Sequence, residues 1–152
     1  MTVIMPLYDV HHSRGKGLAA LLLSKQSNLF MNAFSTIATI MTRQLWTLHP
    51  DDNLLVARDL FNEHRIHHIP VVRDRQIVGL LSRSDFDCYL AGMNKADEGF
   101  ESRLANAYVE GIMTTRLAKL ESDDRVNVAL EVFSLNRFHA LPVVDNGELV
   151  GI

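Results

Sequence analysis

The sequence is poor in cysteine and lacks a long apolar run. Cys88 is the only cysteine, so no disulfide can form within the chain, which fits a reducing compartment. The longest strongly apolar stretch near the start, Leu18 to Leu23, is far too short to span a bilayer. It is also a poor signal peptide, because Lys25 follows closely and no small-residue cleavage site is evident. We therefore expect a cytoplasmic protein without membrane insertion.

A surplus of basic residues is missing as well. The 152 residues include 15 Lys and Arg against 18 Asp and Glu, a formal net charge of −3. This balance argues against a nucleic-acid partner, because an extended phosphate backbone requires a basic face. It still allows a small basic pocket. The hydrophobic fraction of 47% and the charged fraction of 22% are those of an ordinary soluble globular protein.

The common catalytic motifs are absent too. The sequence contains no Gly-x-Ser-x-Gly elbow, no phosphate-binding loop and no paired zinc motif. We therefore expect no catalytic residues, no obligatory cofactor and no enzymatic activity. Cys88 lies beside Phe86 and Tyr89 on an expected helix, where it should be a small residue of the core or of its boundary.

Three histidines have the spacing of metal ligands. His64, His67 and His68 would suit zinc or copper if one helix carried all of them. Pro70 opposes this arrangement, because it restricts the preceding residue to extended geometry and so ends the helix earlier. No cysteine or carboxylate completes a tetrahedral set nearby. We expect no metal site, and surface or phosphate-facing positions fit these histidines better.

An internal repeat dominates the chain. Shifting the sequence against itself by 72 positions aligns Ile40-Met41-Thr42 with Ile112-Met113-Thr114. The register continues without a gap for about forty residues and ends with Val78-Gly79 on Val150-Gly151. The second copy stops at Ile152, within what the first copy continues as residues 81–85. The repeat predicts two related units that share a core.

Each copy is expected to form strand, helix, strand, strand and helix. In the first copy these are Leu45 to Leu48, a helix capped by Asp51 or Asp52, Ile69 to Val72, Ile77 to Leu81, and a helix after Asp85. The strands around the first helix should pair in parallel, and the last two should pair antiparallel. In the second copy Asp145-Asn146-Gly147 predicts a hairpin turn. The fold class is α/β, of the α+β type: two pseudo-twofold-related β-α-β-β-α repeats, the second truncated before its last helix.

The repeat also predicts the domain boundaries. Residues 1–30 form a partly flexible N-terminal segment, 31–91 the first copy, 92–104 a linker, and 105–152 the incomplete second copy. The apolar residues from Phe30 to Met41 are spaced as in an amphipathic helix that leads into the first copy. The linker is polar and begins with a glycine, which is typical of a connector.

The segment Ser82-Arg83-Ser84-Asp85 permits two interpretations. In the first it is a capping box, in which Ser82 caps the helix and Asp85 returns a bond to the Ser82 amide. In the second the same helix start offers amides to a polar ligand, and the carboxylate accepts hydrogen bonds from both hydroxyls of a ribose. The local pattern alone does not distinguish them.

The duplicated pattern Ile-Met-Thr, then Arg-x-His-x-x-Pro-Val-Val, then Val-Gly-x-x-Ser-x-Ser-Asp, resembles the CBS domain over residues 31 to 152. Two such domains form a Bateman module, a regulatory unit that binds AMP, ADP, ATP, S-adenosylmethionine or a related ligand between its copies. The resemblance implies that one wall of the site contacts the base and ribose and that the other contacts the base and phosphates. The implied ligand-binding residues are Leu80, Ser82, Ser84 and Asp85 on one wall, and Thr114, Leu117, Phe138 and His139 on the other.

By the pseudo-twofold symmetry, a second cleft would have an equivalent lining. Its expected residues are Thr42, Leu45, Ile66, His67 and His68. The ribose-binding positions of this cleft would follow Ile152, so the second site is expected to be incomplete.

Two further hypotheses compete with the ligand sensor. The first is a structural or dimerisation module with an empty cleft, in which Ser82 and Asp85 act only as caps. The resemblance also implies a homodimer formed through the CBS helices in either case. The second is a metal-responsive binder that uses the histidines. The sequence does not identify the regulated partner protein.

Overall fold

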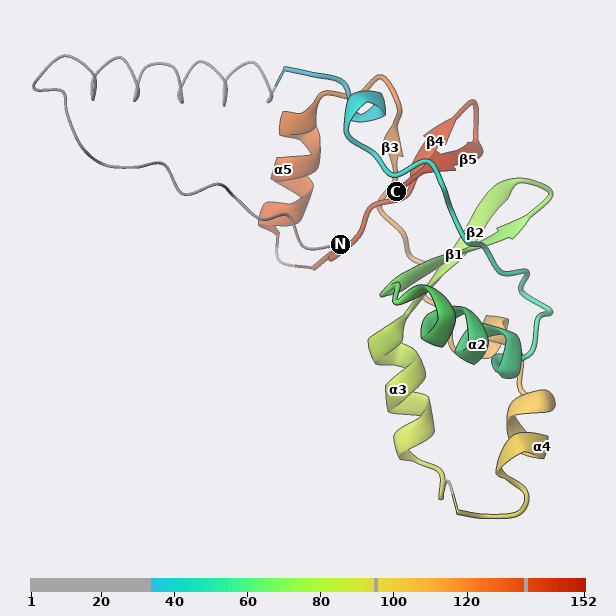
Figure 1. Cartoon of the computed structure of the whole chain (residues 1–152). Coiled ribbons are helices and arrows are strands. Elements are labelled where there is room, and N and C mark those ends of the chain that lie inside the picture. Colours follow the sequence, from blue (N-terminus) through green and yellow to red (C-terminus); the bar gives the residue numbers. More distant parts are fainter. Residues whose placement is uncertain (1–33, 95, 136) are drawn as a thin grey trace, which may run out of the picture. The chain divides into compact units, whose positions relative to one another are not determined.

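The two copies form matching helices and hairpins in the computed structural model, which describes residues 34–94, 96–135 and 137–152 (Figure 1). All its helices and strands belong to one unit, Ser35–Ile152. In chain order they are η1 (Ile37–Thr39, a 3-10 helix), α2 (Leu54–His64), β1 (His68–Arg73), β2 (Gln76–Ser82), α3 (Arg83–Ala91), α4 (Phe100–Ala105), η2 (Val109–Gly111, a 3-10 helix), β3 (Leu120–Glu121), α5 (Val126–Ser134), β4 (Val143–Asp145) and β5 (Glu148–Gly151). The predicted fold class is confirmed.

Helix α2 begins at a different cap from the one predicted. The Asn53 side chain accepts hydrogen bonds from the amides of Leu55 and Val56, so Asn53 is the N-cap and not Asp51 or Asp52. Asp52 instead accepts a bond from the amide of His49 at 2.7 Å, which closes the turn before the helix. An aspartate and an asparagine are both good caps, and only the path of the chain decides which of them faces the free amides.

The strand pairing follows the prediction. Strands β1 and β2 form an antiparallel hairpin, as do β4 and β5, while β3 pairs in parallel with β4. In the first copy, Leu48 pairs in parallel with Val71 through an isolated bridge, so the expected first strand is reduced to one residue. The predicted turn at Asn146 and Gly147 is present, with φ of 50° and 84°.

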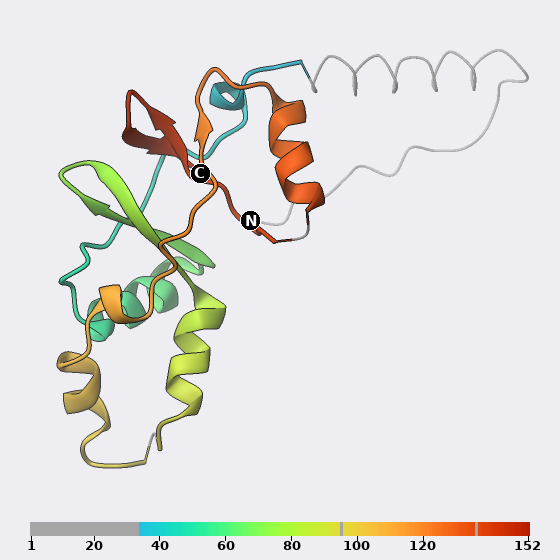
Figure 2. The same cartoon turned by 180° about the vertical axis from the view of Figure 1, so that it is seen from behind.

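The two hairpins join into one sheet only at their tips. The strand order is β1-β2-β5-β4-β3, and β2 meets β5 through the single pair Gln76 and Glu148. An ion pair of 2.8 Å between Arg75 and Glu148 lies at the same place. Each hairpin therefore has its own layer of helices, with α2 and α3 beside β1–β2 and α5 beside β3 (Figure 2).

The copies exchange their leading segments. The first residue of α2, Leu54, donates its amide hydrogen bond to Ala107 of the second copy at 2.9 Å. Val126, at the start of α5, does the same to Ser35 of the first copy, also at 2.9 Å. The two hydrophobic cores reflect this exchange: η2 contributes Val109 to the core of the first copy, and η1 contributes Ile37 to the core of the second. Each core thus contains residues from both copies.

A close glycine–methionine contact occurs once in each copy. A Cβ placed on Gly79 would lie 2.3 Å from the sulfur of Met113, and one placed on Gly151 would lie 2.5 Å from the sulfur of Met41. The backbone beside each contact pairs across the copies. Leu80 and Thr114 exchange two hydrogen bonds of 2.9 Å, and the equivalent Ile152 and Thr42 exchange bonds of 3.1 and 2.8 Å. The matching methionines therefore pack the repeat together, as their spacing indicates.

Two local predictions are wrong. Of the expected helix from Phe30 to Met41, residues 30–33 lie outside the described residues, and the rest contains only the 3-10 turn η1. Cys88 is exposed, because the side of α3 that packs inward carries Phe86 and Leu90. The segment predicted as a linker contains the start of helix α4, in which Leu104 is fully buried and anchors the segment on the first core. The predicted boundaries of the linker and of the two copies stay a prediction.

Candidate ligand-binding site

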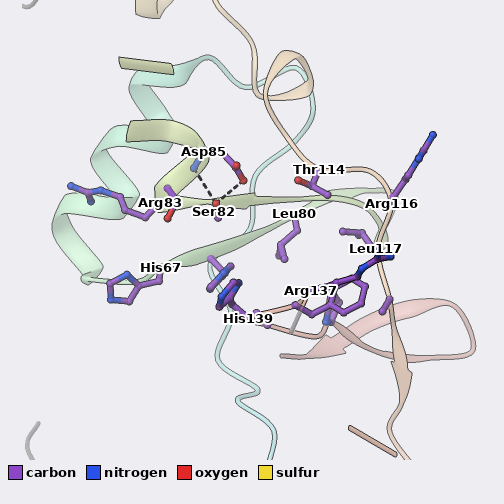
Figure 3. Close-up of a pocket in the computed structure, with 16 residues that line it drawn as sticks. His67, Leu80, Ser82, Arg83, Asp85, Thr114, Arg116, Leu117, Arg137 and His139 are labelled. Atoms are coloured by element: carbon purple, nitrogen blue, oxygen red, sulfur yellow. Dashed lines mark hydrogen bonds between the residues drawn. The ribbon is translucent and has the colours of Figure 1, made fainter. Parts of the chain in front are cut away.

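One cavity of about 560 Å³ lies between the two copies, and it brings together every residue predicted for the first cleft. They are Leu80, Ser82, Ser84, Asp85, Thr114, Leu117, Phe138 and His139. The first four belong to the end of β2 and the start of α3, and the others belong to the second copy. Figure 3 shows Ser82 and Asp85 facing Thr114, Leu117 and His139 across Leu80. The volume is within the range of small-molecule sites in proteins.

The Ser82–Asp85 pair has the geometry of a cap. The amide of Asp85 donates to the hydroxyl oxygen of Ser82 at 3.0 Å, and the Ser82 hydroxyl donates to Asp85 Oδ2 at 2.6 Å (Figure 3). The returned bond thus runs to the serine hydroxyl, whereas the capping box predicts a bond to the serine amide. Because one carboxylate oxygen is held in this way, the orientation of the exposed carboxylate is fixed while its other oxygen stays available to accept.

Two amides at the start of α3 are occupied. The amide of Arg83 donates to the backbone oxygen of His67 at 2.8 Å, and that of Asp85 donates to Ser82. The expectation that this helix start offers free amides to a ligand is therefore wrong for these two positions. Asp85 provides the acidic group of this wall.

The opposite wall is fixed by backbone pairing. The two hydrogen bonds between Leu80 and Thr114 hold the segment that continues to Leu117 against the end of β2. Leu80, Leu117 and Phe138 are each half-buried and line the cavity. Three apolar side chains from both copies therefore offer faces on which a flat ring can pack.

A group of histidines lines the same cavity. His67 precedes β1, His68 is its first residue, and His139 comes from the segment before β4. Burial lowers the pKa of His68 below its ordinary value of 6.5, and the neighbouring His139 and His67 lower this pKa further, while Asp85 raises it. His68 is therefore neutral at neutral pH and can donate or accept a hydrogen bond.

Sequence reasoning missed several residues of this cavity. His67 and His68, predicted for the second cleft, line the first one as well, and so do Arg83, Arg116 and Arg137. Arg137 belongs to the repeated Arg-x-His pattern, so a signal for it was present in the sequence. Arg116 lies outside that pattern, and no signal marked it.

The second cleft differs from its prediction. A cavity of about 460 Å³ is lined by Thr42, Ile66, His67 and His68, but Leu45 lines neither of the two cavities. This cavity extends instead to Phe133 of α5. In the first copy the ring equivalent to that of Phe133 is Phe61, which packs against Phe86 of α3 with ring centroids 5.6 Å apart. The second cavity therefore occupies space that α3 fills in the first copy, and the two cavities are not equivalent under the pseudo-twofold symmetry.

The histidines do not gather around a metal position. Among the described residues, no group of three or more His, Cys, Asp or Glu side chains could hold a metal ion. His64 is stacked on Trp46, with ring centroids 3.8 Å apart and planes 8° from parallel, and does not line the cavity with His67 and His68. In the part of the chain that the structure describes, no helix is long and apolar enough to cross a membrane.

Comparison with known proteins identifies the repeat. The CBS domain family matches residues 37–92 and 109–152, which are most of the described chain. The chain belongs to the CBS domain family. Its two matched segments are the two copies of the repeat, arranged as a tandem CBS pair.

Relatives of this CBS pair include parts of larger proteins. Inosine-5′-monophosphate dehydrogenase of Thermoplasma acidophilum is 28% identical over 115 residues, which are 75% of this chain and 21% of that enzyme. This chain thus spans only about a fifth of that relative. The CBS domain of a CBS domain containing membrane protein from Sphaerobacter thermophilus has the same fold, with a TM-score of 0.72 at 23% identity over 88% of this chain and 91% of that one. CBSX2, solved in complex with AMP, has a TM-score of 0.63 at 25% identity, covering 76% of this chain and 87% of that one.

Proposed function

We propose that this CBS pair is a regulatory module that binds an adenosine-containing nucleotide, such as AMP, ADP or ATP, in the cavity between its copies. The observation that carries the proposal is the gathering of all eight predicted residues around one cavity. The similarity to CBSX2, a CBS protein solved with AMP, supports the ligand class. The proposal assigns no catalytic role to any residue.

Each wall has a separate task in this proposal. The Asp85 carboxylate accepts hydrogen bonds from the two ribose hydroxyls, and Ser82 keeps it oriented through the 2.6 Å bond. The adenine packs between Leu80 and the apolar side chains Leu117 and Phe138 of the second copy. His139 lies on the second wall, where its ring nitrogens can donate to a phosphate.

Binding is coupled to regulation because the ligand bridges the two copies. The sheet itself connects them only through the pair Gln76 and Glu148, and backbone hydrogen bonds such as those between Leu80 and Thr114 join them beside the cavity. A ligand held by Asp85 on one copy and by His139 on the other favours one orientation, and a partner protein could recognise it.

A structural or dimerisation module is the second candidate. The observation in its favour is that the Ser82–Asp85 hydrogen bonds are fully explained by capping of α3. The helices also expose apolar side chains, among them Val56 on α2 and Leu130 on α5, with exposed fractions of 41% and 58%. Such faces fit the homodimer that the family resemblance implies. Under this hypothesis no nucleoside stabilises the protein.

The two candidates are separated by binding measurements on a matched pair of variants. Adenosine, AMP, ADP, ATP, S-adenosylmethionine and GTP are titrated by calorimetry into the wild-type chain, Asp85→Asn and Asp123→Asn. The side-chain amide introduced by Asp85→Asn can still accept from Ser82, which preserves the cap, but it lacks the charge that receives the ribose hydroxyls. Asp123 is exposed and lines neither cavity, so Asp123→Asn controls for the loss of one negative charge.

The sensor proposal expects one or more adenine compounds to bind. At a hundredfold excess over its dissociation constant the ligand should raise the unfolding free energy by about 2.7 kcal/mol. Asp85→Asn should weaken that binding about tenfold or more, whereas Asp123→Asn should bind like the wild type. Equal binding by Asp85→Asn and wild type would reject the ribose role, and binding of none of these compounds would favour the structural module.

A further inference from the structure

The cavity has a charge opposite in sign to that of the whole chain. Its lining includes three arginines, Arg83, Arg116 and Arg137, and a single carboxylate, Asp85. The chain has a formal net charge of −3. The lining thus has three positive charges against one negative charge in an acidic protein, which favours an anionic ligand over a neutral or cationic one.

The three arginines differ in the interactions that they form with other residues. Arg83 pairs with Asp87 at 3.3 Å, and its guanidinium lies 5.4 Å from the ring centroid of Phe61. Arg116 and Arg137 are exposed and form no ion pair with any residue that the structure describes. In Figure 3, Arg116 extends outward at one edge of the cavity, and Arg137 lies between His139 and Leu117. Within the described residues, two guanidinium groups without an ion pair thus stand beside the wall that faces Asp85.

The three histidines of the cavity add hydrogen-bond donors to its lining, in which Asp85 is the single carboxylate. Burial and the neighbouring His139 and His67 lower the pKa of His68, and Asp85 is the acid that counters them there. An anion placed among these rings would relieve that repulsion and accept their hydrogen bonds. The polar lining therefore complements a phosphate group better than the positively charged sulfonium of S-adenosylmethionine.

We propose that this cavity selects its ligand by phosphate charge, with Arg116 and Arg137 as the specificity-determining residues. The inference rests on the proposed adenosine site and adds that the phosphate chain, and not the nucleoside, supplies the selectivity. Guanidinium groups bind phosphates in a planar, two-bond geometry, and their long side chains can reach over the mouth of the cavity. The expected order of affinity is ATP, ADP, AMP, adenosine, with S-adenosylmethionine no tighter than adenosine.

The test compares two double variants that remove the same charge. Arg116→Gln with Arg137→Gln removes the cavity arginines. Arg65→Gln with Arg73→Gln removes two exposed arginines that line neither cavity. Each protein is titrated with adenosine, AMP, ADP, ATP, GTP and S-adenosylmethionine at low and at high salt. Thermal unfolding without ligand checks that both double variants fold.

In the cavity variant, ATP affinity should fall by about three- to tenfold for each arginine removed, with adenosine unchanged. In the control variant the preference for phosphates should persist. Added salt should weaken the binding of ATP and leave the binding of adenosine unaffected.

The contrary outcomes separate the inference from the function on which it rests. Adenosine binding as tightly as ATP, S-adenosylmethionine binding more tightly than ATP, or an unchanged phosphate preference in the cavity variant would overturn the inference and leave the adenosine site standing. If ATP and GTP bind equally, the phosphate selectivity stands and the adenosine proposal fails. If no compound binds, both fail.

Discussion

The contact between Gly79 and Met113 leads to a quantitative prediction. A Cβ added at Gly79 would lie 2.3 Å from the sulfur of Met113, 2.9 Å from its Cγ and 3.3 Å from its Cβ. Ordinary contact begins at 3.4 Å, so the methionine must move by about 1 Å or more. The glycine backbone cannot retreat freely, because Gly79 pairs with Val71 in the β1–β2 ladder. Gly79→Ala should therefore lower the unfolding free energy by about 1–3 kcal/mol.

A double-mutant cycle isolates this contact. Met113→Ala alone leaves a gap beside Gly79, whereas in the double variant the new methyl group occupies part of that gap. The double variant should therefore be more stable than the sum of the single effects predicts, with a coupling of about 0.5–3 kcal/mol. The assay is urea denaturation followed by far-UV circular dichroism and by the fluorescence of Trp46, the only tryptophan.

The control is a glycine without neighbours. A Cβ on Gly111 would meet no atom within 4 Å, so Gly111→Ala should be neutral or slightly stabilising. If Gly79→Ala were as mild as Gly111→Ala, or if the effects of Gly79→Ala and Met113→Ala were additive, the close contact would not constrain the packing between the two copies.

Two further predictions concern single residues. Asn53→Ala should lower the unfolding free energy, measured by urea denaturation, by about 1 kcal/mol, because the amides of Leu55 and Val56 lose their acceptor. Asn53→Asp should retain most of the stability. An equal loss in both variants would contradict the role of Asn53 as the cap. The folded-state pKa of His68 is lowered, so its contribution to stability is fully present above its ordinary pKa of 6.5 and is lost as the pH falls through the lower value. Unfolding free energy should therefore decline as the pH falls below about 6.5, and decline less in His68→Gln; identical slopes would refute this role.

Local pattern was sufficient for much of the fold. The 72-residue repeat, the antiparallel hairpins and the turn at Asn146-Gly147 all depend on residues close in sequence, where propensity and turn chemistry act directly. The start of helix α2 could be placed to within a residue or two, but its cap could not, because Asp51, Asp52 and Asn53 are all suitable caps. The eight candidate ligand-binding residues came from the family resemblance, and the structure brings them to one cavity.

Only the tertiary structure decided which segments meet. The exchange of leading segments, which places Val109 in one core and Ile37 in the other, follows from contacts between residues far apart in the chain. Whether Arg116 and Arg137 find a carboxylate among the described residues likewise depends on what folds beside them. Leu45 was expected in a cleft because its repeat partner Leu117 lines one, but the second cavity occupies different space. Sequence periodicity specifies which face of an element is apolar, whereas the long-range packing of those faces determines the cavities and the charges around them.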